Sequence, residues 1–337
     1  MRRFFNNKDE LVPEMIGGFI KSFSDSFYKL EGRNGVVYKP SLGKERVRII
    51  GGSGSAGEPW GIGACGEGMA DAFAVGNTFS APSASIIDAL CREVCGEEGV
   101  LCIFGNHMGD ILNFELGRDL FLTDCPDKKV MLLPVTDDLG SGRAGASRAA
   151  RKSLTGPVTV LTIAAAAAAD GLPLEEVYGV ARRANGNISS ITQTLDTMTN
   201  PVTGFKMREI PRDEIHFGTG VTGEPGIRTE KFTGERAATH IALDYLIDDL
   251  CLKAGDEAAL LISGCGGVTV MENLIVANTA HDYLRAKGIR ILDTDVNDRN
   301  KVQDANSIAL SLLKLDAELK KYYFRRACSP LTAKAHF

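Results

Sequence analysis

Three times in its first half, the sequence passes from an apolar run of strand length into a polar or glycine-rich loop. The runs cover residues 47–50, 99–104 and 130–135. Strands that are apolar on both sides are typical of a sheet with helices on its faces. In such sheets, ligands bind at the carboxyl ends of the strands. The repetition therefore predicts an α/β fold with a parallel or mixed sheet, and functional loops at one edge of that sheet.

Helix-like segments lie between these runs. A stripe of apolar residues at four-residue steps predicts an amphipathic helix near the N-terminus that docks on the sheet. Its members are Leu11, Met15, Phe19, Phe23 and Phe27. Further helices are expected at residues 85–95 and at 158–169, where the alanine-rich run stops before Gly171.

The second half offers a further set of α/β elements. Helices are expected at residues 236–252 and 271–287, and strands at 257–263, 289–292 and 307–315. Between the two sets lies a polar, proline-containing stretch at residues 185–213, which is typical of a boundary between domains.

Chain length supports this division, because 337 residues are about twice an ordinary domain. We therefore predict two α/β domains, each with a parallel or mixed sheet flanked by helices. Residues 1–190 form the first domain, which holds the glycine-rich loop and the Asp110 loop. Residues 191–337 form the second domain, which contributes the Thr222 loop.

Composition excludes several classes of function. The net charge of −5 gives no electrostatic reason to expect nucleic acid or an anionic membrane as a partner. No apolar run approaches the roughly 20 residues of a membrane helix, and the N-terminus lacks the apolar stretch of a signal peptide. The eight cysteines form no Cys-x-x-Cys pair, so we expect reduced thiols and no metal site in a cytoplasmic protein.

The first glycine-rich loop matches Gly-x-Gly-x-x-Gly at residues 52–57. A dinucleotide site would need a helix to begin in this loop. Here Glu58 and Pro59 follow at once, so a dinucleotide site is not expected. Two interpretations stay open. The main-chain N–H groups near Gly54 and Ser55 can form a wall that approaches a small hydroxylated ligand closely, or the loop is a turn-rich linker.

The second loop ends a predicted strand and runs into a helix at residues 105–115. Asp110 is expected near the N-terminus of that helix, where it can cap the helix or accept the proton of an attacking hydroxyl. His107 is either a second polar contact for a ligand or an ordinary loop histidine. Asp137 and Asp138 are adjacent, so their side chains point apart, and a turn or capping role is expected.

Taken together, these loops resemble those of the K subunit of dihydroxyacetone kinase. Residues 51–59 resemble that family's Gly-Gly-Gly-Ser-Gly-His-Glu-Pro loop, although the match is imperfect. Residues 106–114 fit its Asn-Tyr-x-Gly-Asp-x-x-Asn-Phe signature, and residues 218–226 fit its Gly-x-Gly-x-His-Gly-Glu-Pro-Gly loop. The matches run in order over most of the chain, so the resemblance implies the fold of this family.

The resemblance implies a homodimeric, two-domain subunit that holds a short hydroxyketone. In this family a separate all-helical subunit brings the nucleotide and its magnesium ions, so none is expected on this chain. The chain ends at Phe337 with no room for such a module. It is therefore expected to be inactive without a nucleotide-binding partner, with ATP, or a phosphorylated carrier that recharges bound ADP, as the donor.

Departures from the family pattern fall on its polar substrate contacts. The histidine that holds the ketone covalently is replaced by Thr222, which can only hydrogen-bond a ligand. A second family histidine is replaced by Gly57, a lysine by Gly105, and a tyrosine by His107. The resemblance therefore implies a small sugar, polyol or ketone that is bound without a covalent link.

Two functions follow from this pattern. In the first, the chain is a kinase subunit in which Asp110 orients or deprotonates the substrate hydroxyl, the amides near Gly54 and Ser55 hold it, and His107 and Thr222 complete the pocket. Phosphoryl transfer needs mainly positioning and charge neutralisation, so one carboxylate and the partner's metal ions can suffice. In the alternative, the chain is a catalytically degenerate paralogue that senses a ligand and regulates a partner.

Overall fold

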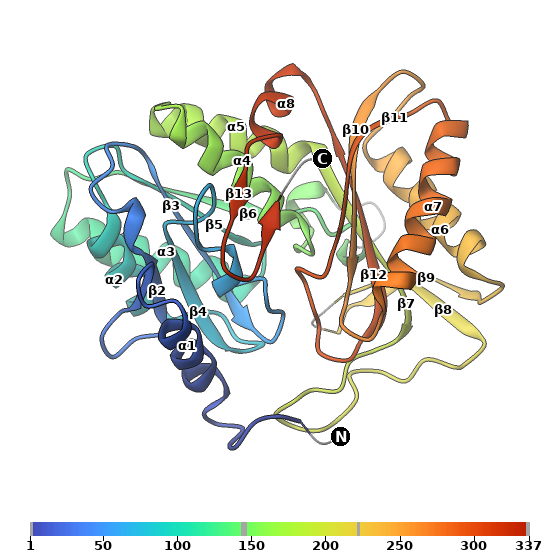
Figure 1. Cartoon of the computed structure of the whole chain (residues 1–337), viewed down its shortest axis with the longest axis horizontal. Helices are drawn as coiled ribbons and strands as arrows, with labels where there is room; N and C mark the ends of the chain where they lie inside the picture. The colour runs from blue at the N-terminus through green and yellow to red at the C-terminus, as the bar shows by residue number, and fades with distance from the viewer. Residues whose placement is uncertain (1–2, 143–146, 221–222, 335–337) are drawn as a thin grey trace. The chain divides into compact units, whose positions relative to one another are not determined.

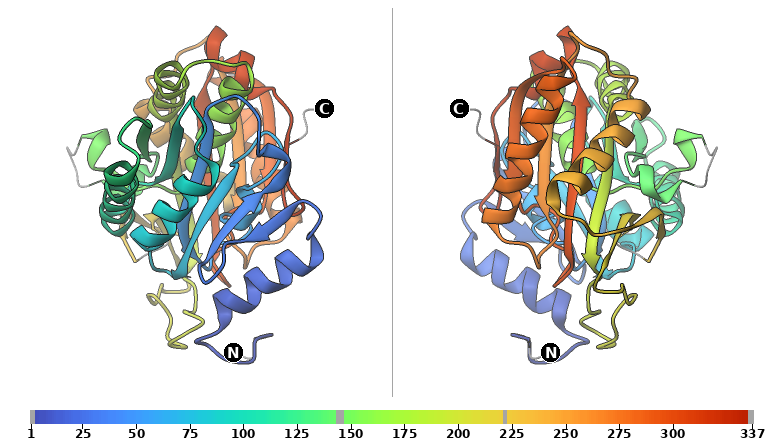
Figure 2. Two further views of the ribbon diagram at one scale, coloured as in Figure 1. Left: turned by 90° about the vertical axis from the view of Figure 1, so that its left-hand side faces the viewer. Right: turned by 90° about the vertical axis from the view of Figure 1, so that its right-hand side faces the viewer.

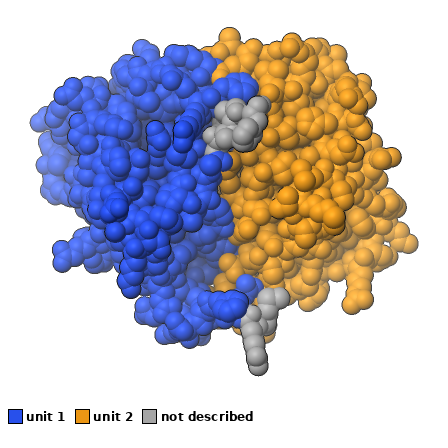
Figure 3. Space-filling model, in the orientation of Figure 1, with its two compact units in different colours: residues 1–135, 157–183, 321–337 blue, residues 136–156, 184–320 orange. Residues whose placement is uncertain are grey.

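The chain forms two compact units, shown in Figures 1 and 3. The computed structural model describes residues 3–142, 147–220 and 223–334. The first unit comprises residues 1–135, 157–183 and 321–337, and the second comprises residues 136–156 and 184–320. Each unit is thus built from separate stretches of the chain, whereas a single boundary at residue 190 was predicted.

A mixed sheet organises the first unit, with the strand order β1-β2-β4-β3-β5-β6. The strands are β1 (Phe27–Lys29), β2 (Gly35–Tyr38), β3 (Arg48–Ser55), β4 (Ala72–Thr78), β5 (Val100–Gly105) and β6 (Val130–Val135). The strands β4, β3, β5 and β6 run parallel, whereas β2 runs antiparallel to both of its neighbours, β1 and β4. The three predicted apolar runs are β3, β5 and β6.

Helices cover both faces of this sheet (Figure 1). They are α1 (Leu11–Ser22), α2 (Ala84–Val94), α3 (Met108–Asp124), α4 (Gly156–Ala169) and α5 (Leu174–Asn187). A short helix, α8 (Ala317–Tyr323), lies near the C-terminal end of the chain. Two consecutive glycines of β3 face opposite sides of the sheet. A Cβ atom on Gly52 would meet Phe114 of α3, and one on Gly51 would come near Leu161 of α4. The helices α3 and α4 therefore lie on opposite faces.

The glycine-rich segment is partly strand and not, as predicted, loop from its first residue. β3 continues to Ser55, through Gly51 and Gly52. A Cβ atom would lie 2.6 Å from the ring of Phe73 at Gly51, and 2.5 Å from the ring of Phe114 at Gly52. These two glycines therefore let the protein's own aromatic rings pack against the strand.

The N-terminal helix is shorter than the apolar stripe predicted. α1 ends at Ser22, and Phe27 opens β1. The buried side chains of α1 include Val12 and Ile16, which are not members of the stripe. Phe27 still packs near the helix, since its ring centroid lies 4.9 Å from that of Phe19. The stripe thus joins a helix and a strand that meet in the core.

A second mixed sheet organises the other unit, with the strand order β11-β10-β12-β7-β8-β9. The strands are β7 (Ile188–Asp196), β8 (Glu214–Thr219), β9 (Pro225–Lys231), β10 (Glu257–Gly264), β11 (Arg290–Asn297) and β12 (Asn306–Lys314). β10 and β11 run parallel, and the other neighbours run antiparallel. The predicted strands correspond to β10, β11 and β12.

One face of this second sheet is apolar and the other carries hydroxyl groups. α6 (Glu235–Asp249) and α7 (Val270–Ala286) cover the apolar face (Figure 2). On the opposite face, the hydroxyl groups of Thr155, Ser190 and Ser311 hydrogen-bond to one another over 2.5 to 3.0 Å. These side chains are thereby satisfied without water.

Both units combine a mixed sheet with helices, so the predicted α/β class is confirmed. Among the helices of the described chain, none has the length and apolar character needed to cross a membrane. All eight cysteines are free thiols. The described residues also contain no group of three or more histidine, cysteine, aspartate or glutamate side chains arranged to hold a metal ion.

Candidate functional site

The candidate site lies at the carboxyl ends of two neighbouring parallel strands of the first unit. β3 pairs with β5 in a register that places Gly52 opposite Phe104, so both strands end at the same edge of the sheet. At or next to this edge lie six of the predicted site residues, namely Gly54, Ser55, Gly57, Gly105, His107 and Asp110.

Asp110 is buried in the first turn of α3, with 5% of its surface exposed. The N-cap position of this helix is His107, whose side chain makes no capping hydrogen bond. The Oδ1 atom of Asp110 is buried and has no hydrogen-bond partner in the described part of the chain. Its carboxyl group is therefore not tied up in the end of its own helix.

Burial changes the acidity of this carboxyl group. Desolvation raises the pKa of Asp110 from 3.8 to about 7, because the charged form is poorly stabilised away from water. A group with a pKa near neutrality exchanges protons readily at physiological pH, which suits a general base. Perturbed carboxyl groups of this kind are concentrated at functional sites.

The backbone of Ser80 packs closely against the end of β3. A Cβ atom on Gly54 would lie 2.8 Å from the backbone nitrogen of Ser80, so this position requires glycine for packing. The Oγ atom of Ser55 donates a hydrogen bond of 2.6 Å to the carbonyl oxygen of Gly76. The Ser55 hydroxyl thus holds β3 to the end of β4, and its proton is not available to a ligand.

Gly57 lies in a turn that is stabilised by an acidic side chain. The carboxylate of Glu58 accepts a hydrogen bond of 2.9 Å from the backbone N–H of Ala56. Ala56 adopts a φ of 87°, which is unusual for a residue other than glycine. Burial raises the pKa of Glu58. The glutamate of this Gly-Glu-Pro sequence therefore has a structural role, which is to stabilise the turn.

Gly105 and His107 shape the entry into α3. Gly105 ends β5, and its carbonyl oxygen accepts a hydrogen bond of 2.7 Å from the backbone N–H of His107. His107 is extended, with φ −106° and ψ 140°, and its side chain is half-buried. This tight turn brings the first residues of α3, including Asp110, directly to the edge of the sheet.

A segment that was not assigned to the site lies beside it, at residues 79–84. Phe79 adopts a φ of 53°, and the backbone N–H of Ala84 donates to Oδ1 of Asn113 over 3.1 Å. A Cβ atom on Gly109 would lie 3.3 Å from that of Ala81. The segment therefore lies close to the end of β3 and to the first turns of α3. The sequence of this segment does not indicate a left-handed backbone at Phe79, so the position of the segment beside the site was not predicted.

The Thr222 loop belongs to the second unit, and Thr222 itself lies outside the described residues. On its flank, Glu224 forms an ion pair with Lys152, and its carbonyl oxygen accepts a hydrogen bond of 3.2 Å from the N–H of Gly220. A Cβ atom on Gly220 would collide with the Glu224 side chain. This second Gly-Glu-Pro sequence, like the first, thus uses its glutamate to hold the loop.

The two adjacent aspartates serve as caps, as predicted. Asp138 accepts a hydrogen bond of 3.0 Å from the N–H of Gly140. The fully buried carboxylate of Asp137 accepts three, from the N–H groups of Leu154, Thr155 and Gly156, over 2.7 to 3.1 Å. Each carboxylate satisfies backbone donors.

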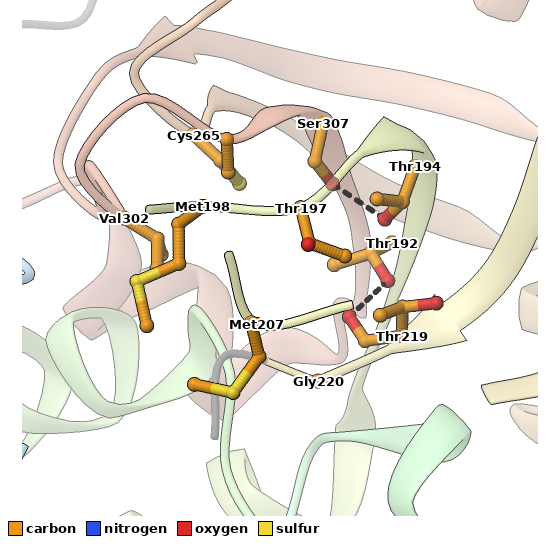
Figure 4. A pocket seen from close by; sticks show the side chains of 11 residues that line it. Thr192, Thr194, Thr197, Met198, Met207, Thr219, Gly220, Cys265, Val302 and Ser307 are labelled. Carbon is orange, nitrogen blue, oxygen red and sulfur yellow. Dashed lines mark hydrogen bonds between the residues drawn. The ribbon is translucent and has the colours of Figure 1, made fainter. Parts of the chain in front are cut away.

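A small cavity in the second unit lies next to Thr219 and Gly220 (Figure 4). Two hydrogen bonds of 2.8 Å border it, from Thr192 to the carbonyl oxygen of Thr219 and between Thr194 and Ser307. Its volume is about 30 Å³, which is enough room for a water molecule.

A comparison with models of known protein families identifies the family of this chain. The Dak1 domain model matches residues 17–331. The chain belongs to the Dak1 domain family. The resemblance predicted from the loops is therefore confirmed.

Several curated proteins resemble this Dak1 chain over nearly its full length. A PTS-dependent dihydroxyacetone kinase 2, dihydroxyacetone-binding subunit DhaK, from Listeria innocua is 34% identical over 95% of this chain and 96% of that protein. D-erythrulose kinase from Mycolicibacterium smegmatis is 29% identical over 99% of this chain and 57% of that protein. The Dak1 chain is thus similar to complete binding subunits and to a part of longer kinases.

Solved structures confirm the fold of this Dak1 domain. The dihydroxyacetone kinase of C. freundii in complex with AMP-PNP and Mg²⁺ superposes with a TM-score of 0.88 at 25% identity, and this chain spans 61% of its length. The dihydroxyacetone kinase operon co-activator Dha-DhaQ superposes with a TM-score of 0.85 at 25% identity, over 92% of this chain and 95% of that one.

Proposed function

We propose that this chain is the substrate-binding subunit of a dihydroxyacetone-kinase-like phosphotransferase that acts on a small hydroxylated ketone, sugar or polyol. The observation that carries the proposal is the carboxyl group of Asp110. It is buried at the carboxyl edge of the first sheet, and its Oδ1 atom has no protein partner among the described residues. Buried polar groups are normally hydrogen-bonded, and a substrate hydroxyl would supply the bond.

Asp110 would orient the attacking hydroxyl and accept its proton. The elevated pKa of this carboxyl group, about 7, matches the task of a base that must take up a proton at neutral pH. Phosphoryl transfer depends mainly on positioning and on neutralising the developing charge. One such carboxylate, together with metal ions on the partner, would suffice.

The substrate would be held without a covalent link. Gly57 and Thr222 stand where the family resemblance implies histidines, and neither can form a carbon–nitrogen bond with a ketone. The backbone near Gly54 and Ser55 and the side chains of His107 and Thr222 would supply hydrogen bonds. Relatives are named for dihydroxyacetone and for erythrulose, which agrees with a ligand of three or four carbons.

The phosphoryl donor would come from a second protein. Relatives of similar length are called PTS-dependent binding subunits, and the C. freundii kinase that was solved with AMP-PNP and Mg²⁺ is longer than this chain. We infer that a separate helical subunit carries the nucleotide and magnesium, and that the chain alone is inactive. A cytoplasmic homodimer would be the working form.

The test is a kinase assay with the cognate nucleotide-binding subunit, ATP or the phosphorylated carrier, and a panel of short ketoses and polyols. Asp110→Asn should lower the turnover number by about 10²- to 10⁴-fold, the usual contribution of a general base. Asp282→Asn is the control, because the side chain of Asp282 is 62% exposed on α7, and this variant should retain activity. Full activity of Asp110→Asn would contradict the proposed role.

The alternative of a ligand-sensing regulatory subunit keeps one observation in its favour. The co-activator Dha-DhaQ has the same fold, with a TM-score of 0.85, so the fold alone does not separate the two functions. A ketose that raises the melting temperature of the chain, but is never phosphorylated in the presence of the partner and donor, would favour the sensor.

A further inference from the structure

α3 carries an exposed apolar stripe that runs the length of the helix away from Asp110. Its members are Met108, Leu112, Leu116 and Leu120, with exposed fractions between 44% and 69%. A single exposed leucine is ordinary, but a contiguous row of large apolar side chains on one helix commonly marks an interaction surface.

The core does not need this stripe, because α3 already fills the core with its opposite face. Phe114 and Phe121 are buried in the apolar cluster of the first unit. A Cβ atom on Gly117 would lie 2.7 Å from the side chain of Ile87, so α3 packs closely against α2, as Figures 1 and 2 show. The exposed leucines are therefore additional to the contacts that hold the fold together.

The spacing of the stripe fits a helix as its partner. Residues four apart form a continuous ridge on a helix surface, and two such ridges interdigitate when the helices cross at about −50°. The four apolar residues of α3 make one ridge of this kind over three turns. A partner that places its own apolar helix across α3 would cover all four.

The position of the stripe, next to Asp110, indicates which protein docks on it. Met108 and Leu112 lie within one turn of Asp110, so a protein seated on them also reaches the edge where the phosphoryl group must arrive. We propose that the stripe of α3 is the docking surface for a helix of the nucleotide-carrying subunit. This inference rests on the proposed function, since that function requires a second protein to bring the donor to Asp110.

Charge favours such a partner over a second copy of this chain. Glu115 lies on the exposed side of α3 beside the stripe, whereas the charge of Asp119 is balanced by Arg118. A twofold contact between two copies of α3 would bring two Glu115 carboxylates into one interface, and like charges in an interface are unfavourable. A helix with basic residues beside its apolar ridge would match both features.

Direct binding of the purified cognate nucleotide-binding subunit, measured by calorimetry, tests the proposal. Leu116→Arg should weaken binding by at least tenfold, because it places a charge in the middle of the ridge. Leu42→Arg is the control, since Leu42 is an exposed leucine outside the α-helices and should bind as the wild type does. Both replaced side chains are exposed, and melting temperatures check that each variant folds.

The same measurements separate this proposal from its alternatives. Unchanged binding by Leu116→Arg, equal losses in both variants, or no binding by the wild type would each overturn it. A change in the oligomeric state of Leu116→Arg alone in solution would assign the stripe to a second copy and also overturn it. If the wild type binds the partner and Leu116→Arg does not, but no ketose or polyol is phosphorylated, the docking surface stands and the proposed function fails.

Discussion

Replacing Asp110 with asparagine should change how the free energy of unfolding depends on pH. The folded chain holds this carboxyl at a pKa of about 7, compared with 3.8 for an unperturbed group. Above pH 4 the unfolded chain therefore releases a proton that the folded chain retains. The free energy of unfolding falls as the pH rises, and this fall ends once the pH has passed 7.

The magnitude follows from the two pKa values. A rise from 3.8 to about 7 corresponds to a destabilisation of about 4 kcal/mol at high pH, at 1.36 kcal/mol for each pH unit. Of this, about 2.5 kcal/mol develops between pH 5 and pH 8. Asparagine is neutral throughout, so the wild type should lose about that much stability relative to Asp110→Asn over this interval.

Urea unfolding at pH 5 and pH 8 measures the difference, because the comparison of two pH values removes any constant effect of the amide. Asp119→Asn is the control, since the side chain of Asp119 is 61% exposed on the same helix and should show the pH dependence of the wild type. If Asp110→Asn and the wild type depend on pH in the same way, Asp110 is not desolvated, and the reasoning about its role as a base is refuted.

Three further replacements test the packing and the caps by urea unfolding. Gly52→Ala should cost about 1–3 kcal/mol, because the added Cβ would lie 2.5 Å from the ring of Phe114; a neutral result would mean that the ring moves freely. Thr269→Ala should cost about 1 kcal/mol by removing the capping box with Glu272, unless water replaces the cap. Asp137→Asn should cost about 2–4 kcal/mol, because it turns an amide donor toward buried N–H groups; unchanged stability would show that these donors have another partner.

The parallel core of the first unit was predictable because its strands are apolar throughout. Residues 99–104 and 130–135 became β5 and β6 with little change of bounds. β7 was missed for the opposite reason, since Ser189, Ser190 and Thr192 are polar and yet buried. Hydrogen bonds from other segments of the chain satisfy part of this row, and a sequence does not display such long-range partners.

The candidate site was predictable in position more than in chemistry. A strand followed by a helix places Asp110 at the sheet edge from local pattern alone. The burial of its carboxyl group depends on the packing of distant segments, so the raised pKa was not predicted. Similarly, Gly54 was singled out as part of a glycine-rich run. The structure shows that this position requires glycine because the backbone of Ser80, 26 positions along the chain, lies against it.

The three hydroxyl groups of Thr155, Ser190 and Ser311 close a ring on the second sheet. Each hydroxyl can donate one proton and accept another. Ser190 donates to Ser311, so Ser311 can donate to Thr155 and Thr155 to Ser190, and all three hydroxyl groups are satisfied. Such a ring carries no net charge. It therefore keeps that part of the sheet satisfied at any pH at which the protein is folded, in contrast to the carboxyl group on which the proposed chemistry depends.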